Sequence, residues 1–360
     1  MWKNHIFTKK TDCFQYYLLL LQRIFYLSLI HSMNIMNTRQ LKYLFHNGKN
    51  PKYKYYLNTY YKTYFPRPFL RPFLKKKLES LHERADKDYI LSRVNYYNNL
   101  AAGCVTDTNE WQQKAIAVEK QKKNHPSVYF FDTMEYARWF PKHLKYTLLP
   151  GDITTVPTIP SIVKSRPIHG NNANSVILNL DKVRHFVFLN DRLSFEEKKD
   201  LAIFRGGVKN NHNRWLFMEK FFNHPRVSAA STDQANSGWR KEPITLWEHL
   251  KYKFILSLEG NDVASNLKWI MSSNSIAIMP KPTYETWFME GTLIPDYHYI
   301  EIKPDFSDLL EKMDYYIAHP DKAKEIIKNA HEYVDQFRNK ERENLISLLV
   351  LDKYFRLTNS

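Results

Sequence analysis

The chain has 360 residues, 43% of them hydrophobic and 25% charged, which is the balance of a folded globular protein of about two domains. With only two cysteines and nine glycines, it cannot hold a disulfide framework, a multi-cysteine metal site or a collagen-like repeat. The formal net charge of +16 is concentrated near the N-terminus, because residues 1–80 contain 15 Lys and Arg but two acidic residues. Such a block attracts a polyanion, either a nucleic acid or an anionic membrane surface.

Residues 1–77 form the first predicted region, a basic and aromatic arm. Its apolar run Tyr16–Ile30 is short for a membrane-spanning helix and is interrupted by Gln22-Arg23, which favours an amphipathic helix at a membrane interface. An over-long start-codon assignment for the first 32 residues is an equal alternative, because two methionines follow.

In residues 37–77, Tyr and Phe alternate with Lys and Arg. This mixture suits a lipid headgroup layer, a single-stranded nucleic acid, or a solvated arm packed on the body. We favour the anionic membrane surface and expect no nucleic acid as a partner.

The predicted strands are short runs of β-branched, aliphatic and aromatic residues, at 127–132, 145–152, 174–181, 185–191, 201–207, 254–258, 275–279 and 298–302. Segments with helical periodicity lie between and beyond them, at 78–99, 109–121, 134–140, 214–222, from 265 onward, at 306–318 and at 321–337, with one more helix at the end. Strands that alternate with helices at this spacing predict an α/β fold with a parallel sheet.

Ligands of such sheets bind beyond the carboxyl ends of the strands, so residues that follow a strand are candidates for function. Asp152 lies at the tip of the predicted strand at 145–152 and could act as a general base. An aspartate that merely starts a turn is the commoner reason for such a residue.

Arg205-Gly206-Gly207 ends another predicted strand. A cation beside glycines that let a ligand approach the backbone suits a phosphate group. A solvated arginine in a surface turn explains the same residues.

Ser265 lies between the strand at 254–258 and a predicted helix, which it could cap. Free backbone N–H groups at a helix start form a site for a diphosphate. A plain strand–cap–helix joint is equally compatible with the sequence, which here has neither the dinucleotide nor the P-loop glycine pattern.

Asp86-Lys87-Asp88 spells the metal-binding DxD motif of many sugar transferases, but it lies within a helical pattern. We therefore expect these charges on a solvated helix face. No cluster of Cys and His has metal-ligand spacing, and no GxSxG nucleophile motif occurs. We expect no metal site and no cofactor.

Three segments together resemble glycosyltransferase family 90: "FRGG" at 204–207, "HLKYKFILSLEGNDVASNLKWIMSSNSIAIMP" at 249–280 and "YETWFMEGTLIPDYHYIEI" at 284–302. The resemblance covers roughly residues 125–345 and is strongest to the family's bacterial lipopolysaccharide core transferases. It implies a GT-B fold, in which two Rossmann-like domains face a central cleft. We expect the acceptor-side domain at 78–185, the nucleotide-sugar domain at 186–338 and a helix at 339–360 that packs back.

The resemblance also implies roles for single residues. The family's catalytic base matches Asp152 in "GDITTVP", where Gly151 replaces an arginine, and the family's Phe-Arg-Gly matches 204–206. Its Ala-Ser-x-Arg donor loop matches Ala264-Ser265, but Leu267 stands at the arginine position, with Lys268 beside it. The donor-binding residues expected on this basis are Arg205, Gly206, Gly207, Ser265, Asn266, Lys268 and Glu285, and the acceptor-binding residues are Lys164 and Arg166.

The resemblance therefore implies an inverting hexosyltransferase that uses UDP-glucose or UDP-galactose and acts on the inner core of lipopolysaccharide. We expect it in the cytoplasm, peripheral to the inner membrane, with the basic arm on the membrane surface. The competing interpretation is a basic membrane- or nucleic-acid-binding protein with a non-catalytic α/β body.

Overall fold

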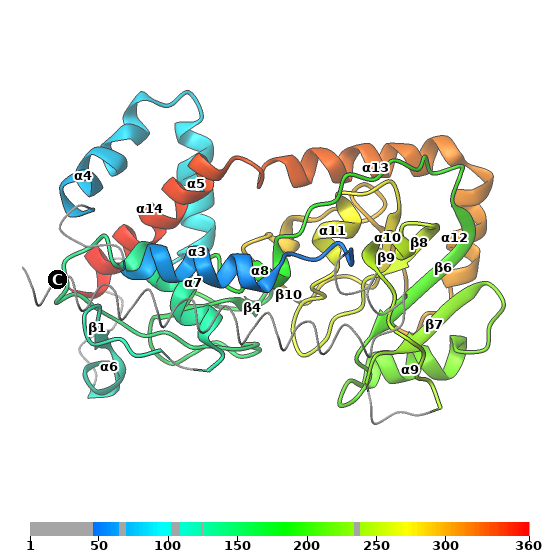
Figure 1. The fold of residues 1–360 in the computed structure, drawn as a ribbon, viewed down its shortest axis with the longest axis horizontal. Coiled ribbons are helices and arrows are strands. Elements are labelled where there is room, and N and C mark those ends of the chain that lie inside the picture. The colour runs from blue at the N-terminus through cyan, green and yellow to red at the C-terminus, as the bar shows by residue number, and fades with distance from the viewer. Residues whose placement is uncertain (1–45, 65–69, 102–108, 124, 234–237, 360) are drawn as a thin grey trace, which may run out of the picture. The chain divides into compact units, whose positions relative to one another are not determined.

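The computed structural model describes residues 46–64, 70–101, 109–123, 125–233 and 238–359 (Figure 1). Residues 49–242 and 247–360 form one compact unit, and residues 1–48 with 243–246 form another. The larger unit contains the sheets and the site described below. The segment Tyr16–Ile30 lies outside the described residues. No described helix is both long enough and apolar enough to cross a membrane.

A five-stranded sheet, in the order β11-β9-β8-β6-β7, is the centre of the C-terminal half. Every neighbouring pair in it is parallel. Its strands are β6 (Lys199–Gly206), β7 (Val227–Ser231), β8 (Tyr252–Leu256), β9 (Ile276–Met279) and β11 (Ile300–Glu301). The α/β class with a parallel sheet is thus confirmed. The continuous apolar sequence of β9, all of it buried, is typical of a parallel strand covered on both faces.

Helices cover this sheet, and alternate residues of each strand reach them. Phe204, Phe254 and Ile278 belong to one buried cluster with residues of the helices. The helices of this half are α9 (His212–Phe221), α10 (Leu246–His249), α11 (Leu267–Met271), α12 (Leu309–Ala318) and α13 (Pro320–Asp335), with a 3-10 turn at Glu290–Thr292. The predicted helices at 214–222, 306–318 and 321–337 are confirmed as α9, α12 and α13.

The strand order reverses between β6 and β8. From β6 the chain moves to β7 on one side, and it then returns to place β8 on the other side of β6. At such a reversal, the loops that leave the two strands diverge and open a crevice at their carboxyl ends. Residues 207–211 and 257–266 are these two loops.

In the N-terminal half, the sheets among the described residues have two strands each. They pair β1 (Ile116–Ala117) with β2 (Lys145–Tyr146), β3 (Ser161–Val163) with β5 (Ser175–Ile177), and β4 (Ser165–Pro167) with β10 (Tyr284–Thr286). The helices are α3 (Lys52–Tyr64), α4 (Arg71–Glu79), a 3-10 turn (Ser80–Glu83), α5 (Lys87–Tyr97), α6 (Asn109–Lys114), α7 (Ser127–Ala137) and α8 (Lys182–His185). A second Rossmann-like domain and the division into four regions stay predictions.

Two predicted strands are wrong. Residues 127–132 begin helix α7, and residues 185–191 form no strand. Nine of the 11 residues of α7 are buried, so its sequence is apolar on every side and has no helical stripe. A short, fully buried helix and a buried strand look alike in such a sequence.

Helix α14 (Lys340–Thr358) follows the five-stranded sheet in sequence but packs against α4, α5, α7 and β2 of the N-terminal half. The carboxylate of Glu343 accepts two hydrogen bonds from Arg93 of α5, 2.5 and 3.0 Å long. Asn98 donates to the carbonyl of Val350. The last described helix thus completes the core of the N-terminal half.

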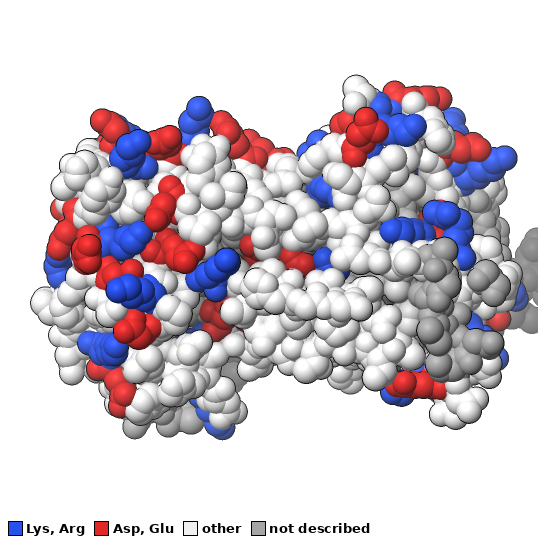
Figure 2. All heavy atoms as spheres, turned by 180° about the vertical axis from the view of Figure 1, so that it is seen from behind, with Lys and Arg blue, Asp and Glu red and all other residues white. Residues whose placement is uncertain are grey.

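The surface shown in Figure 2 has Lys and Arg interspersed with Asp and Glu, not gathered in one patch. This agrees with the sequence, in which the basic excess belongs to residues 1–80.

Candidate active site

A polar hollow of about 240 Å³ lies at the carboxyl ends of β6 and β8. Four segments contribute to it: the loop after β2, helix α8, the loop from β6 into α9, and the loop after β8. Its lining residues are Asp152, Arg184, His185, Gly207, Lys209, Asn211, Arg214, Gly260, Asn261, Asp262, Val263 and Ser265. The hollow therefore lies where strand order reverses, the usual place for a ligand in an open α/β sheet.

Asp152 is held at the wall of this hollow by the ammonium group of Lys164. Lys164 Nζ lies 2.5 Å from Asp152 Oδ1 and 2.8 Å from Asp262 Oδ2. Asn261 Nδ2 donates to the other oxygen of Asp152 at 3.3 Å. Lys164 is fully buried, whereas the Asp152 side chain is 28% exposed. One carboxylate oxygen of Asp152 thus stays fixed while the group remains accessible.

The ion pair sets the protonation of both partners. Burial acts to raise the pKa of Asp152, but the hydrogen bond and the charge of Lys164 outweigh it and lower that pKa below its ordinary value. Burial acts to lower the pKa of Lys164, but Asp262 and Asp152 together raise it. At neutral pH, Asp152 is therefore a carboxylate and can accept a proton.

The backbone before Asp152 requires a glycine. Gly151 has φ +105, a conformation that L side chains rarely adopt, although a Cβ there would meet no atom within 4 Å. Directly after Asp152, Ile153 N–H donates to Ser165 Oγ, and that hydroxyl donates back to the Ile153 carbonyl. These bonds fix the loop that carries Asp152 to β4.

Arg214 ties the two loops of the switch point together. Its Nε, Nη1 and Nη2 atoms donate to the carbonyls of Glu259, Gly207 and Leu258, at 3.0, 2.9 and 2.7 Å. Asn211 caps α9 by accepting from the N–H of Arg214 and donates to the Gly260 carbonyl at 2.7 Å. The sequence prediction did not include Arg214, because nothing near it in the chain distinguishes it from other helix arginines.

The glycines of these loops make room for the protein's own side chains. A Cβ on Gly260 would lie 3.1 Å from Arg214 Nη2, and one on Gly206 would lie 2.9 Å from the ring of Phe204. A Cβ on Gly207 would lie 3.0 Å from Asp233 Oδ1. Asp233 accepts from the N–H groups of Val208 and Lys209, at 2.5 and 2.7 Å.

A second, more apolar hollow of about 120 Å³ adjoins the first and shares Val263 with it. It lies beyond β8 and β9, between Leu258, Ala264, Pro280 and Tyr284. Glu259 borders it and accepts from Thr283 N–H and Oγ1 at 2.9 and 2.6 Å. Two adjoining hollows, one polar and one apolar, suit a ligand with a charged part and a flat apolar part.

Several predicted site residues have partners inside the protein. Lys268 is fully buried and lies 2.5 Å from Glu290, which borders the apolar hollow. Arg205 donates to the Phe204 carbonyl at 2.7 Å and to Ser228 Oγ at 3.0 Å, and it does not line the polar hollow.

Two more predicted residues form a buried pair on β4 and β10. Arg166 Nε lies 2.7 Å from Glu285 Oε1, with both side chains almost fully buried. Tyr96 also donates to Glu285. Neither this pair nor the Lys164 ammonium presents its charge to solvent. The acceptor role of Lys164 and Arg166 and the donor role of Glu285 stay predictions.

The expected helix start at Ser265 differs in detail. The helix is α11, five residues long, and its N-cap is Asn266, whose side chain donates to the Leu256 carbonyl at 2.9 Å. Ser265 precedes this cap and lines the polar hollow. The predicted donor residues that do line this hollow are Gly207 and Ser265, together with the predicted base Asp152.

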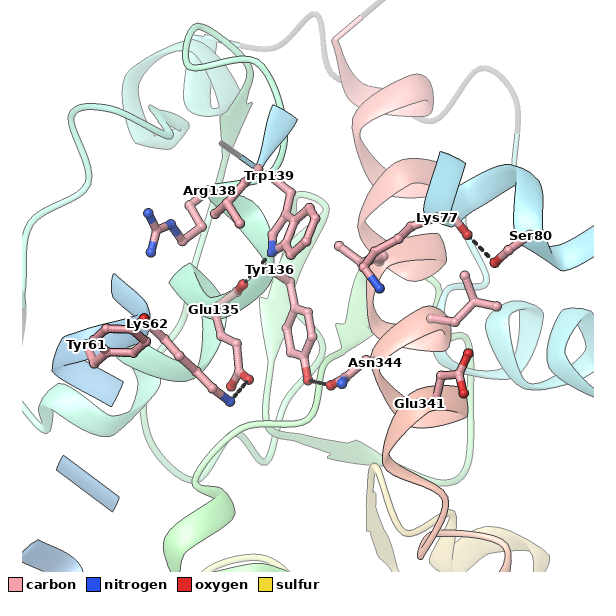
Figure 3. Close-up of a pocket in the computed structure, with 13 residues that line it drawn as sticks. Tyr61, Lys62, Lys77, Ser80, Glu135, Tyr136, Arg138, Trp139, Glu341 and Asn344 are labelled. Atoms are coloured by element: carbon pink, nitrogen blue, oxygen red, sulfur yellow. Dashed lines mark hydrogen bonds and ion pairs between the residues drawn. The ribbon is translucent and has the colours of Figure 1, made fainter. Parts of the chain in front are cut away.

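A third hollow, the helix-bounded hollow, lies elsewhere, between α3, α4, α7 and α14, with a volume of about 370 Å³ (Figure 3). Leu70, Trp139, Leu345 and Leu348 contribute to its lining. Two polar pairs lie in this hollow: Lys62 pairs with Glu135 at 2.6 Å, and Tyr136 donates to Asn344 at 2.9 Å (Figure 3).

Among the residues that the structure describes, no group of three or more His, Cys, Asp and Glu is placed to hold a metal ion. Asp86 of the DxD sequence pairs instead with Arg84 at 2.7 Å and with Arg342 at 3.4 Å.

An ionised carboxylate at the switch point of a parallel sheet is a candidate catalytic group, and comparison with known proteins gives the class of the protein. The family model of Glycosyl transferase family 90 matches residues 174–359. The chain therefore belongs to glycosyltransferase family 90 and is a glycosyltransferase, which confirms the resemblance seen in the sequence.

The chain is also similar to individual glycosyltransferases. The chain is 43% identical over 270 residues to O-glucosyltransferase LpsA of Dichelobacter nodosus, an alignment covering 74% of this chain and 83% of that protein. It is 24% identical over 249 residues to Protein O-glucosyltransferase 3 of Rattus norvegicus, covering 65% of this chain and 48% of that protein. Protein O-glucosyltransferase 1 of Rattus norvegicus is 25% identical over 150 residues, or 39% of this chain and 38% of that protein.

Proposed function

We propose that this glycosyltransferase moves glucose, with inversion, from UDP-glucose to a hydroxyl of the inner core of lipopolysaccharide. The observation that carries the proposal is the ionised, accessible Asp152 held at the switch point by Lys164. The names of the relatives, which are O-glucosyltransferases, favour glucose over galactose. The name LpsA supports lipopolysaccharide as the acceptor.

In the proposed reaction, Asp152 accepts the proton of an acceptor hydroxyl while that oxygen attacks the anomeric carbon of the donor sugar. A new C–O bond forms on the face opposite the nucleotide, and the bond from the anomeric carbon to the β-phosphate oxygen breaks. The electron pair of that bond leaves with UDP. Lys164 keeps the base ionised before the transfer, and its charge becomes available to Asp262 when Asp152 is protonated.

Cations of the polar hollow would stabilise the charge that develops on the departing diphosphate. Arg184, Lys209 and Arg214 border it. Arg214 has five N–H donors and uses three of them on backbone carbonyls, so two are left for a phosphate oxygen. The uridine would occupy the adjoining apolar hollow, which Val263 links to the polar one.

We expect that no metal ion is needed for this reaction. Activity measured after dialysis against EDTA should then equal the activity with added Mg²⁺ or Mn²⁺. A loss of activity that either metal restores would overturn this part of the proposal.

We propose that the protein contacts the membrane through the exposed face of α3. Tyr53, Leu57, Tyr61 and Tyr64 follow one another at helical spacing, and each is between 67 and 70% exposed. The opposite face of α3 packs on α7, where the Tyr55 hydroxyl donates to Asp132 Oδ1 at 2.7 Å.

The charges around this stripe fit an anionic surface. Helices α3 and α4 contain six lysines and, at the end of α4, one glutamate. Exposed tyrosines beside lysines suit the headgroup layer of an anionic membrane. This face would keep the enzyme close to a glycolipid acceptor.

The function is tested with purified protein, UDP-glucose and lipopolysaccharide from a strain that lacks the gene. Asp152→Asn should lower kcat by about 100-fold or more, because the amide cannot accept the proton, while the affinity for UDP stays the same. Normal transfer by the variant would refute the role of Asp152. No transfer by the wild type from any UDP-sugar would favour the competing interpretation, a non-catalytic body.

The membrane face is tested by flotation with vesicles. Replacement of Tyr53, Leu57, Tyr61 and Tyr64 by serine should release the protein from vesicles that contain anionic lipid, and activity on a soluble acceptor should persist. Binding to purely zwitterionic vesicles should be weak for both proteins. Unchanged flotation of the variant would contradict the assignment of α3.

A further inference from the structure

His185 is a buried histidine at the end of α8 that borders the polar hollow. Its side chain is 2% exposed. Throughout the part of the chain that the structure describes, neither of its ring nitrogens has a hydrogen-bond partner. The nearest carboxylate oxygen, Asp181 Oδ2, is 3.9 Å from Nε2, and Arg184 holds that oxygen at 2.5 Å.

A buried polar group without a partner is rare and costs free energy, so its retention calls for an explanation. The ring nitrogens are buried, but the residue lines the hollow, so a ligand that enters it can satisfy a ring nitrogen once the imidazole turns toward the hollow. We propose that His185 is a sugar-binding residue, whose imidazole makes a hydrogen bond to a hydroxyl group of the sugar that is transferred. This inference rests on the proposed function, because it assigns the ligand of the same site.

The protonation state of His185 selects a hydroxyl over a phosphate. Burial lowers the pKa of His185 well below its ordinary value, and the charges of Lys268, Lys164 and Arg184 lower it further. A neutral imidazole offers one N–H donor and one nitrogen acceptor. A sugar hydroxyl can accept a hydrogen bond from the N–H group or donate one to the other nitrogen, whereas a diphosphate is bound best by cations.

The place of His185 in the hollow agrees with this role. Asp152 and the cations Arg184, Lys209 and Arg214 border the same space as His185. The anomeric carbon must lie between the base and the diphosphate, so the sugar ring occupies the space in between. A hydroxyl of that ring can then reach the imidazole.

Such a contact would contribute to the choice of donor. A site built to hydrogen-bond a hydroxyl rejects an analogue that lacks it, because the buried partner is then left unsatisfied. One deoxy analogue of UDP-glucose should therefore bind worse than the others, and its loss should depend on His185.

The experiment compares the affinities for UDP and for UDP-glucose by titration calorimetry. His185→Phe keeps a buried ring but removes both nitrogens, so UDP-glucose should bind about tenfold more weakly while UDP binds as before. His185→Asn, which restores a donor and an acceptor, should recover part of the loss. The matched control is His298→Phe, since His298 is a half-buried histidine outside the hollow, and it should change neither affinity.

A measurement on the wild type does not depend on the folding of a variant. With ¹⁵N-labelled histidine, the ring signals of His185 should shift when UDP-glucose is added and stay in place with UDP alone. Calorimetry with the four deoxy analogues, from 2- to 6-deoxy, then identifies the hydroxyl, because His185→Phe should not weaken the critical analogue further.

The two levels of failure are distinguishable. If the wild type binds neither UDP nor UDP-glucose, the proposed function is wrong. If it binds and transfers glucose, but His185→Phe weakens UDP and UDP-glucose equally or weakens neither, the sugar contact is wrong and the proposed function stands. Ring signals that respond equally to UDP and UDP-glucose would also overturn the sugar contact.

Discussion

The helix-bounded hollow of Figure 3 and the polar hollow at the strand ends differ in size and chemistry. The first, at about 370 Å³, is larger than the second, at about 240 Å³. In the first, Lys62, Glu135, Tyr136 and Asn344 bond to one another. In the second, Asp152 is accessible, Arg214 has donors to spare, and His185 has no hydrogen-bond partner among the described residues.

The comparison shows that capacity for new hydrogen bonds, more than volume, marks a site for a polar ligand. Packed proteins leave few buried polar groups unsatisfied, so such groups at a hollow are informative. Position adds to this. The polar hollow lies where the loops after β6 and β8 diverge, whereas helices surround the helix-bounded hollow.

The largest loss of activity is expected from a substitution of Arg214 in the polar hollow. Arg214→Met should lower kcat/KM by about 100-fold, because the loops after β6 and β8 lose their common hydrogen-bond donor and the proposed diphosphate ligand loses a cation. The matched control in the helix-bounded hollow is Tyr136→Phe. It removes the hydrogen bond to Asn344 and should leave kcat/KM within about twofold of the wild-type value. Equal losses in steady-state assays of the two variants would deny the distinction between the hollows.

A smaller effect is expected at Lys164, and it concerns pH. Lys164 lowers the pKa of Asp152, and the base acts only when it is ionised. Removal of the cation in Lys164→Met should raise that pKa and move the acid limb of the kcat/KM profile to higher pH. Lys209→Met, which removes a cation of the same hollow that does not contact Asp152, should leave the limb in place. A limb that stays put in Lys164→Met would show that another group titrates.

The smallest effect on catalysis is expected at Glu285. It is bound by Arg166 and Tyr96 and lies outside both strand-end hollows. Glu285→Gln leaves the buried charge of Arg166 uncompensated, so the free energy of unfolding should fall by about 3 kcal/mol. Urea denaturation measures this loss, and kcat of the folded variant should be unchanged. A drop in donor affinity without a loss of stability would instead support the predicted donor role.

The sequence alone predicted four of the five strands of the C-terminal sheet and missed β7 (Val227–Ser231). The strands β6 and β8 are short apolar runs with clear ends, so Gly207 and Ser265 could be placed beyond strand ends without a structure. The helix α7 could not be identified, because burial on all sides removes its periodic pattern.

The partners of charged residues could not be predicted in the same way. Lys164 and Asp262 are 98 positions apart, and Arg166 and Glu285 are 119 apart. A charge near a strand end looks the same in sequence whether it contacts a ligand or a buried carboxylate. For the same reason, the sequence gives no sign that His185 reaches the hollow.

Helix α14 imposes an order on the synthesis of this protein. Its 19 residues close the core of the N-terminal half, where Glu343 neutralises Arg93 and Tyr354 donates to the carbonyl of Pro160. While α14 is still inside the ribosome, Arg93 lacks its carboxylate and the apolar sides of α5 and α7 lack their cover. The half made first is therefore completed only after α14 has been made, and until then its apolar helix faces are open to aggregation.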